Sequence, residues 1–187
     1  MNNSVQFANA AVMGRFQPFH NEHLKYLLAA KDRCRHLWVG ITRFLPSEKN
    51  RGESHRGQQT ENPLTYFERV VLIDAALRHA GVSREEFTCV PFPIDEPLLL
   101  PHCLSTEIPC LTTLCEPWNE QKIQLLSECG YHVEVLYHNE ERKITGQGIR
   151  NAIREGVLWE SLVPEPVARL LNEWNLHERL QLNSRPE

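Results

Sequence analysis

The chain has 187 residues, 41% of them hydrophobic and 24% charged, and its formal net charge is −4. This composition is typical of a globular protein and argues against disorder and against a fibrous fold. The net negative charge argues against a general attraction to nucleic acid or to an anionic membrane. No apolar run approaches the roughly 18 residues that a membrane-spanning helix needs.

The cysteines and the N-terminal sequence indicate the compartment. Six cysteines are scattered without a Cys-x-x-Cys pair, and no segment with the pattern of a secretory signal precedes the first expected strand. Free thiols in a reducing environment explain this best, which predicts a cytoplasmic protein. The length is enough to bury a full core, so we predict a single domain over residues 1–187.

The first elements are predicted from two apolar runs. Residues 7–13 predict a short buried strand that ends at Gly14, and leucines at helical spacing then predict a helix up to about Lys31. A second apolar run at 37–42 predicts the next strand. A strand, a helix and a strand within so short a stretch form a βαβ unit, so the sheet should be parallel.

The next segment is polar before a helix begins. Residues 45–59 have no periodicity and predict a long loop. Thr65 and Glu68 have the spacing of a capping box, so a helix should begin there, run to about His79 and stop at Gly81.

The rest of the chain repeats the alternation. Apolar runs predict three further strands, at 88–92, 109–114 and 132–137. Helical spacing predicts helices at 97–105, 119–129, 146–155 and 165–175. The fold class is therefore α/β, with a doubly wound, Rossmann-like parallel sheet of five strands and C-terminal helices. We expect residues from about 145 to 187 to form a helical part that carries a second phosphate motif.

The strongest functional signal is the segment Gly-Arg-Phe-Gln-Pro-Phe-His-Asn-Glu-His, residues 14–23. It lies where the first strand gives way to the first helix, which is the ligand end of an open α/β sheet. Gly14 leaves room for a phosphate near the backbone, and His20 and His23 share one face of the first helical turn. The helix N-terminus adds free N–H groups and a positive dipole end. This segment predicts a phosphate site.

A zinc pair is a second interpretation of His20 and His23. A zinc site on a helix needs a further protein ligand, and none with suitable spacing is evident nearby in the sequence. Phosphate binding is therefore favoured over metal binding, and no residue is predicted as a metal ligand.

Near the C-terminal end, Thr145 and Gly146 open another helix. Thr145 is expected to be its N-cap, and the freed amides would form a second phosphate cradle. Arg150 then projects from the first turn and a half.

These segments resemble the HxGH signature of the nucleotidyltransferase superfamily. The Gly-Arg-Phe-Gln-Pro-Phe-His form is similar to that of the archaeal-type nicotinamide mononucleotide adenylyltransferases. The resemblance continues in order from about residue 10 to 175, through blocks at 53–55, 61–69, 145–150 and 159–164.

The resemblance implies a set of site residues. The catalytic set, which binds phosphates and stabilises the transition state, comprises His20, His23, Arg15 and Arg150. Nucleotide binding is expected of Gly14, Phe16, Gln17, Thr145, Gly146 and Gln147. Binding of the second substrate is expected of Asn62, Arg69, Asp95 and Trp118. Mg²⁺ should bridge the phosphates with few protein ligands of its own.

The chain departs from the family pattern at several positions. Glu22 stands where the signature has glycine, Gln147 replaces a threonine or serine, and 114–117 replaces a Gly-Asn type turn. The archaeal-type enzymes carry a tryptophan where this chain has Asp95–Pro109, a stretch without an aromatic ring. Trp118 is a possible substitute.

The resemblance leads us to expect a nucleotidyltransferase that joins ATP to nicotinamide mononucleotide and releases pyrophosphate. One alternative is a cytidylyl- or adenylyltransferase for another phosphate or phosphonate acceptor. Another is a nucleotide-binding regulatory domain that has lost turnover, although retention of both histidines and both arginines argues against it. We expect no nucleic acid or membrane partner, and the apolar run 98–100 is a candidate contact in a homo-oligomer.

Overall fold

The computed structural model of this chain describes residues 5–45, 61–114, 118–138 and 144–182. The predicted loop 45–59 falls outside these residues except for its first position. The chain divides into two compact units, each built from three stretches. Unit 1 comprises Met1–Arg15, Lys25–Phe44 and Val82–Arg142, and unit 2 comprises Phe16–Leu24, Leu45–Gly81 and Lys143–Glu187. This division does not test the predicted single domain, which stays a prediction.

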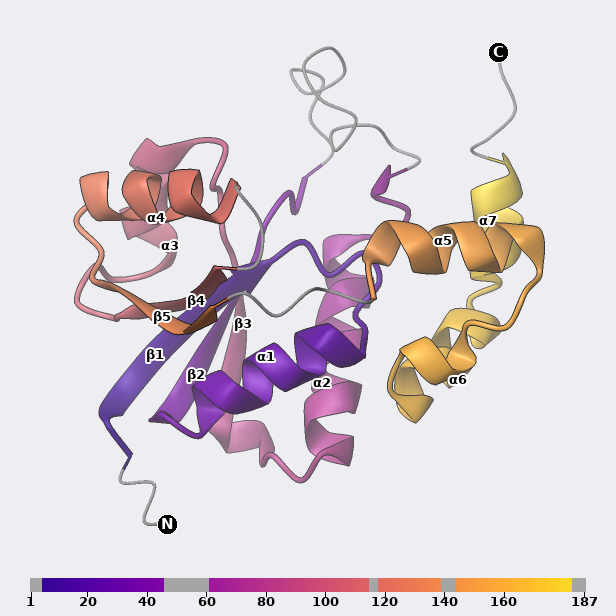
Figure 1. Ribbon diagram of the computed structural model, residues 1–187, viewed down its shortest axis with the longest axis horizontal. Helices are drawn as coiled ribbons and strands as arrows, with labels where there is room; N and C mark the ends of the chain where they lie inside the picture. The colour runs from indigo at the N-terminus through magenta and orange to yellow at the C-terminus, as the bar shows by residue number, and fades with distance from the viewer. Residues whose placement is uncertain (1–4, 46–60, 115–117, 139–143, 183–187) are drawn as a thin grey trace. The chain divides into compact units, whose positions relative to one another are not determined.

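Unit 1 holds a sheet of five parallel strands in the order β3-β2-β1-β4-β5 (Figure 1). The sheet confirms the predicted α/β fold class. Its strands are β1 (Phe7–Gly14), β2 (Cys34–Ile41), β3 (Phe87–Pro91), β4 (Cys110–Leu114) and β5 (Val133–His138). Strand β2 begins three residues before the predicted 37–42 run because its pairing with β1 starts at Cys34.

The strand order reverses between β1 and β4. Strand β1 pairs with β2 along its whole length, whereas its pairing with β4 runs through Ala11 and Cys110. At such a reversal the connections leave the sheet on opposite faces, which opens a crevice at the carboxyl ends of the strands. The end of β1, where the predicted phosphate motif begins, lies at this edge.

Helices cover both faces of the sheet. Alternate residues of β1 point to opposite faces, and Ala11 and Met13 join the apolar cluster under α3 (Leu100–Cys103) and α4 (Trp118–Glu128). Helix α1 (Asn21–Lys31) lies across the other face in Figure 1, where the Tyr26 hydroxyl donates to the Leu111 carbonyl at 2.5 Å. The doubly wound arrangement is therefore confirmed.

The predicted helix at 97–105 is only partly correct. A 3-10 turn at Pro97–Leu99 precedes the four-residue helix α3, and Leu104 is already extended. Proline lacks the N–H that a continuous helix needs, so Pro97 and Pro101 split the segment into two short pieces.

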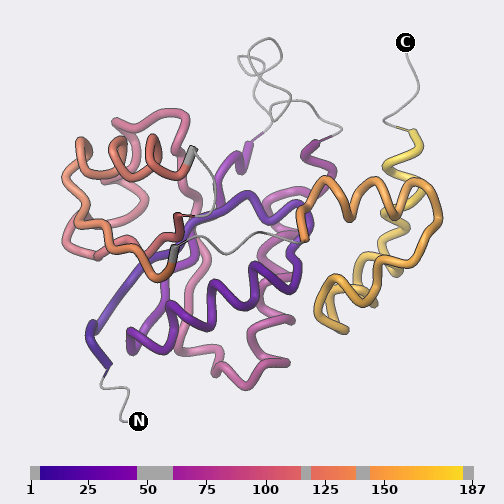
Figure 2. Tube along the Cα trace, in the orientation of Figure 1, coloured from indigo at the N-terminus to yellow at the C-terminus, as the bar shows by residue number. Residues whose placement is uncertain are grey.

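Unit 2 contains four helices among its described residues, α2 (Tyr66–His79), α5 (Gly146–Glu155), α6 (Glu165–Glu173) and α7 (Leu176–Leu182). Helix α2 packs on α6, and α7 packs on both α5 and α6. The trace in Figure 2 shows α5, α6 and α7 following one another at the orange and yellow end of the chain. The predicted helix 165–175 ends two residues early because Trp174 caps α6 and Asn175 adopts a positive φ of 50°. Helix α7 was not predicted.

Both predicted helix starts in unit 2 are confirmed. The Thr65 hydroxyl accepts from the Glu68 N–H at 3.2 Å, and the Glu68 carboxylate accepts from the Thr65 N–H at 2.7 Å, which completes the capping box of α2. Thr145 caps α5 by accepting from the Gly148 N–H at 3.1 Å. Among the described residues, the structure contains no helix that is long and apolar enough to cross a membrane.

Candidate functional site

The predicted phosphate motif follows β1 as a buried loop. The Gly14 carbonyl accepts from the Thr42 N–H at 3.0 Å, which ties the last residue of β1 to the end of β2. Phe16 then adopts a positive φ of 54°, and the Gln17–Pro18 peptide bond is cis. Residues 16–20 are all buried. Arg15 is half-buried and is the last residue of the first stretch of unit 1. Gly14 and Arg15 therefore belong to unit 1, and the rest of the motif belongs to unit 2.

The two histidines of the motif stack on each other. Their ring centroids are 3.5 Å apart and the rings are inclined by 21°. The ring of His23 also packs edge-on against Phe16, with 5.0 Å between ring centroids. These contacts hold both imidazoles in one orientation at the start of α1.

His20 also caps α1. Its Nδ1 accepts from the backbone N–H of His23 at 3.4 Å. A neutral imidazole that accepts at Nδ1 carries its proton on Nε2. This hydrogen bond favours the tautomer of neutral His20 that has Nε2–H free to donate to an anionic oxygen, which suits the role that the sequence predicts for it.

Glu22, the residue in the glycine position of the signature, lies half-buried in the first turn of α1. A carboxylate is favoured there by the positive end of the helix dipole. The neighbouring Asn21 amide donates to the Ser161 carbonyl at 2.9 Å. The dipole accounts for the carboxylate without any contact to a nucleotide.

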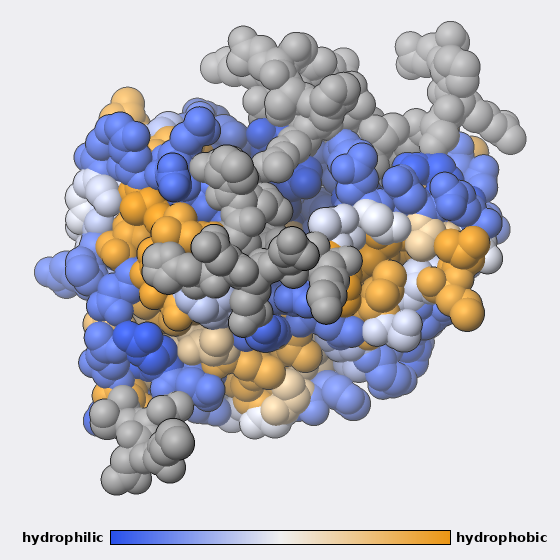
Figure 3. Space-filling view, viewed as in Figure 1, coloured by the Kyte–Doolittle hydropathy of each residue, from blue (hydrophilic) through white to orange (hydrophobic). Residues whose placement is uncertain are grey.

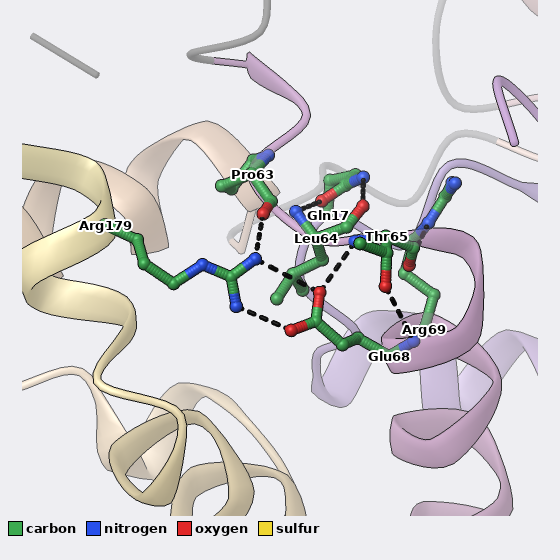
Figure 4. A network of polar contacts seen from close by, with 7 residues as sticks. All are labelled: Gln17, Pro63, Leu64, Thr65, Glu68, Arg69 and Arg179. Carbon is green, nitrogen blue, oxygen red and sulfur yellow. Dashed lines mark hydrogen bonds and ion pairs between the residues drawn. The ribbon is translucent and has the colours of Figure 1, made fainter. Parts of the chain in front are cut away.

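Gln17 is held by the segment that precedes α2. Its Nε2 donates to the Leu64 carbonyl at 2.8 Å, and its Oε1 accepts from the Leu64 N–H at 3.1 Å (Figure 4). Both polar atoms of the side chain are thus engaged within the protein. Gln17 fixes the loop here, and its predicted contact with a nucleotide stays a prediction.

The second phosphate motif meets the first at the Gln17 carbonyl. A Cβ on Gly146 would lie 2.5 Å from that oxygen, so the close approach of the two backbones requires glycine. The Arg150 Nη1 donates to the same carbonyl at 2.6 Å. The structure therefore brings Gly146 and Arg150 together at Gln17 within unit 2, and the binding of phosphate by these residues stays a prediction.

Arg150 is a buried cation, with 1% of its surface exposed. Its Nη2 pairs with the Glu61 carboxylate. Burial lowers the pKa of Arg150, and the negative charge of Glu61 opposes this shift. The pair keeps a guanidinium charged inside the protein, where an isolated charge would be costly. Direct contact between Arg150 and a phosphate stays a prediction.

The remaining predicted residues of unit 2 are Asn62, Arg69, Thr145 and Gln147. Arg69 is buried and its Nε donates to the Thr65 carbonyl at 3.2 Å, while Asn62 is half-buried next to Glu61. Gln147 is exposed in the first turn of α5. The substrate contacts predicted for these residues are not tested by their positions.

Asp95 and Trp118, both predicted to bind the second substrate, also belong to unit 1. Asp95 follows β3 and pairs with the Arg43 Nε at 3.5 Å. Trp118 is the first residue of α4, but its side chain lies outside the described part of the structure. Segment 115–117, one of the departures from the family, also lies outside it.

Unit 1 also contains a set of buried polar residues that the sequence did not predict as a site. Thr112 lies in β4, and Asn119 and Lys122 lie on the buried stripe of α4 that continues to Leu126. The Thr112 Oγ1 and the Asn119 Nδ2 are buried and have no hydrogen-bond partner among the described residues. Buried polar groups are normally paired, so an orphan group calls for an explanation, such as a ligand. The sequence does carry one sign of this set, because Asn119 and Lys122 have the helical spacing that places them on the same face of α4 as the buried Leu126.

Lys122 adds positive charge to this set. It is 7% exposed, and it counteracts the burial that raises the pKa of Cys110 to about 12. Hydroxyl, amide N–H and ammonium groups are all donors, so a ligand of this set would be an anion. Thr112 is the middle residue of β4, and Asn119 and Lys122 lie in the first turns of α4, the helix that follows this strand.

The described residues contain no group of three or more His, Cys, Asp or Glu side chains that could hold a metal ion. The zinc interpretation of His20 and His23 thus gains no third ligand from the described part of the chain.

A hollow of about 760 Å³ lies in unit 2, with Ile153, Trp159 and His177 among its lining residues. No predicted site residue lines it. Figure 3 shows apolar surface at the right of the view, where Figure 1 draws α5 and the helices after it. Leu158, which follows α5 along the chain, is 91% exposed.

Comparison with known proteins agrees with this geometry. A family model described as cytidylyltransferase-like matches residues 11–92. A phosphonoformate cytidylyltransferase from Streptomyces viridochromogenes is 37% identical over 179 residues, which cover 94% of this chain and 97% of that protein. A nicotinamide-nucleotide adenylyltransferase from Thermococcus kodakarensis is 28% identical over 171 residues, covering 91% and 85% of the two chains.

A solved structure supports the fold. The bifunctional NMN adenylyltransferase/ADP ribose pyrophosphatase from Francisella tularensis superposes with a TM-score of 0.69 at 15% identity. The match covers 92% of this chain but about half, 51%, of that structure. The fold, the two joined phosphate motifs and the near-full-length relatives lead to one assignment. The chain belongs to the cytidylyltransferase-like family of the HxGH nucleotidyltransferase superfamily.

Proposed function

We propose that this nucleotidyltransferase moves CMP from CTP to a small phosphonate or phosphate acceptor and releases pyrophosphate. The observation that carries the proposal is the 37% identity with phosphonoformate cytidylyltransferase over nearly the whole of both chains. Identity with the archaeal nicotinamide-nucleotide adenylyltransferases is lower, at 28%. The expected adenylyl transfer to nicotinamide mononucleotide is therefore replaced as the leading proposal.

Two features of unit 1 support a small anionic acceptor. The segment 95–109 has no aromatic ring, and the archaeal-type enzymes that it resembles carry a tryptophan there. The orphan donors Thr112 and Asn119, together with Lys122, suit a compact acid. Phosphonoformate has both a carboxylate and a phosphonate, so it offers oxygens to such donors.

The chemistry requires stabilisation of negative charge. An acceptor oxygen forms a bond to the α-phosphorus, and the bond from that phosphorus to the bridging oxygen of pyrophosphate breaks. Charge accumulates on the oxygens of the phosphorus and on the departing pyrophosphate, where fixed donors lower the barrier most. The Nε2–H of His20, fixed by the cap at Nδ1, is suited to this role. An ionised acceptor needs no strong general base.

Mg²⁺ is part of the proposal. No group of three potential ligands gathers among the described residues, and Mg²⁺ commonly keeps several waters and binds substrate phosphates. The triphosphate oxygens would therefore supply most of its ligands. Bound there, Mg²⁺ would neutralise charge on the phosphates.

Adenylyl transfer to nicotinamide mononucleotide is the second candidate. The similarity to the Thermococcus kodakarensis enzyme, which spans 91% of this chain, favours it. The two candidates differ in both the donor base and the acceptor, so a single assay separates them.

The test crosses two donors with two acceptors. The purified protein with Mg²⁺ is given CTP or ATP, each with phosphonoformate or nicotinamide mononucleotide, and pyrophosphate release and product mass are followed. We expect the CMP adduct of phosphonoformate from CTP, and its loss in His20→Ala. NAD from ATP as the main product would overturn the proposal in favour of the second candidate.

A further inference from the structure

The segment Glu61–Glu68, here called the bracing segment, contacts both phosphate motifs. Leu64 holds the Gln17 side chain through two hydrogen bonds, at 2.8 and 3.1 Å. Glu61 pairs with Arg150, whose Nη1 in turn holds the Gln17 carbonyl. All of these residues belong to unit 2. The position of the loop that leads into His20 therefore depends on the bracing segment.

The bracing segment is itself held by Arg179 of α7. Its Nη1 donates to one carboxylate oxygen of Glu68 at 2.6 Å, and its Nη2 donates to the other at 3.1 Å. The same Nη2 also donates to the Pro63 carbonyl at 2.6 Å. Figure 4 shows the guanidinium reaching from α7 to both partners, directly beside Leu64. One side chain thus fixes the residues on both sides of Leu64 and Thr65.

The geometry of this contact is specific to arginine. A guanidinium can bond both oxygens of a carboxylate and a carbonyl at once, whereas an ammonium is a single point charge on a flexible stem. Burial raises the pKa of Glu68, but hydrogen bonds from Arg179 and Thr65 outweigh it and leave the pKa below its usual value. Glu68 is therefore ionised at neutral pH and engaged on both sides.

We propose that Arg179 is a positioning residue for nucleotidyl transfer. By fixing Pro63 and Glu68 it holds Leu64 against Gln17, and through Gln17 it holds the loop that carries His20. Its side chain bonds to Glu68 and to the Pro63 carbonyl, and neither residue is predicted to bind a nucleotide. The inference rests on the proposed nucleotidyl transfer but not on the choice of donor base or acceptor.

The expected effect is on turnover more than on binding. Transition-state stabilisation depends on the placement of donors within a fraction of an ångström, and a displacement of about 1 Å can cost on the order of 100-fold. Arg179 acts on the loop around Gln17 only through the bracing segment. Its loss should therefore displace the donors of that loop by a smaller distance. We expect Arg179→Gln to lower kcat roughly tenfold, with a much smaller change in KM for the nucleotide.

The experiment compares Arg179→Gln and Arg179→Lys with a matched control, Arg169→Gln. Arg169 is exposed on α6 in the same unit and forms no ion pair among the described residues. We expect the control to leave kcat unchanged and Arg179→Lys to restore part of the loss. Combining Arg179→Gln with Glu68→Gln should lower kcat no further than the larger single effect. Equal kcat for Arg179→Gln and the control would overturn the proposal.

Hydrogen exchange reports on positioning directly. The Leu64 N–H donates to Gln17, so amide exchange across 61–68 and 16–20 should speed up in Arg179→Gln while α6 stays protected. Unchanged exchange in both segments would overturn the proposal. The kinetic comparison uses whichever donor and acceptor the cross-assay identifies, so a wrong choice of base does not affect it. If no pair turns over, the proposed function fails alone, and the exchange comparison still decides the role of Arg179.

Discussion

The loop around Gln17 and the carboxyl end of β4 are both buried and polar, but they differ in how their polar groups are paired. Gln17 uses its amide nitrogen, its amide oxygen and its backbone carbonyl in hydrogen bonds within unit 2. In unit 1, Thr112 and Asn119 each bury a polar atom that has no hydrogen-bond partner in the part of the chain that the structure describes.

The difference separates two kinds of site. Groups that are already paired cost little to hold in place and keep a fixed geometry, which suits the stabilisation of a transition state. Orphan buried groups lower stability until something pairs with them. We therefore interpret the Gln17 region as a preorganised frame and the β4 edge as a place that a bound acid completes.

Removal of His20 should have the largest effect on the preorganised frame. Loss of one fixed donor to a developing charge typically costs about 10²–10³ in kcat. We expect a decrease of this order in His20→Ala, measured as pyrophosphate release at saturating substrates. His79→Ala, at the exposed end of α2, is the control. A variant that keeps more than a tenth of the activity would contradict the role of His20.

A side chain at Gly146 should disturb the same frame by crowding. Its Cβ would meet the Gln17 carbonyl at 2.5 Å, and overpacking of this kind costs about 1–3 kcal/mol. We expect Gly146→Ala to lower both Tm and kcat. Gly148→Ala is the control, because its Cβ would meet only the Thr145 hydroxyl, at 3.2 Å. Equal Tm values for the two variants would refute the requirement for glycine.

Asn119→Leu tests the β4 edge and should affect binding but not stability. Replacing an orphan buried amide by an apolar group of similar size is nearly neutral or stabilising, whereas a lost hydrogen bond to a charged ligand costs about 1.5–3 kcal/mol. We expect an unchanged or higher Tm and a KM for the acceptor raised about tenfold or more. Gln121→Leu, exposed on the same helix, controls for added apolar surface. A higher Tm with an unchanged acceptor KM would mean that no ligand pairs with this amide.

The smallest effect is expected from the dependence of stability on pH through the ion pair between Glu68 and Arg179. Because the pKa of folded Glu68 lies below its unfolded value of about 4.3, its pair with Arg179 stabilises the protein above that pH. The contribution is lost as pH falls through the folded pKa. Glu68→Gln should lower the free energy of unfolding at pH 7 by up to about 1 kcal/mol. Denaturant titrations at pH 7 and below pH 4 should show that this difference shrinks in acid.

The region around His20 and Gln17 could be predicted from the sequence better than the buried polar residues of β4 and α4. The motif around His20 and the capping residues Thr65 and Thr145 depend on local rules, so the fold class and the helix starts could be predicted. Arg179 and Glu61 could not be assigned, because their partners lie 111 and 89 residues away along the chain.

Other differences also have physical causes. Prolines divided the predicted helix 97–105, and α7 was missed because a left-handed Asn175 separates it from α6. Asn119 and Lys122 follow a helical stripe of α4, but a hydrophobicity pattern is read from its apolar residues, so a polar residue on the same face is passed over. The acceptor therefore had to be inferred from relatives.

The contact between Gly146 and Gln17 also limits which amino-acid replacements this protein can accept during evolution. Every other amino acid brings a Cβ to position 146, so each amino-acid replacement there introduces the same clash with the Gln17 carbonyl. A complete mutational scan should therefore find almost no tolerated residue at 146 and many at its exposed neighbour Gln147. New acceptor preferences are then expected to arise from substitutions near β4 and α4, while the glycine persists in descendants that keep the enzyme active.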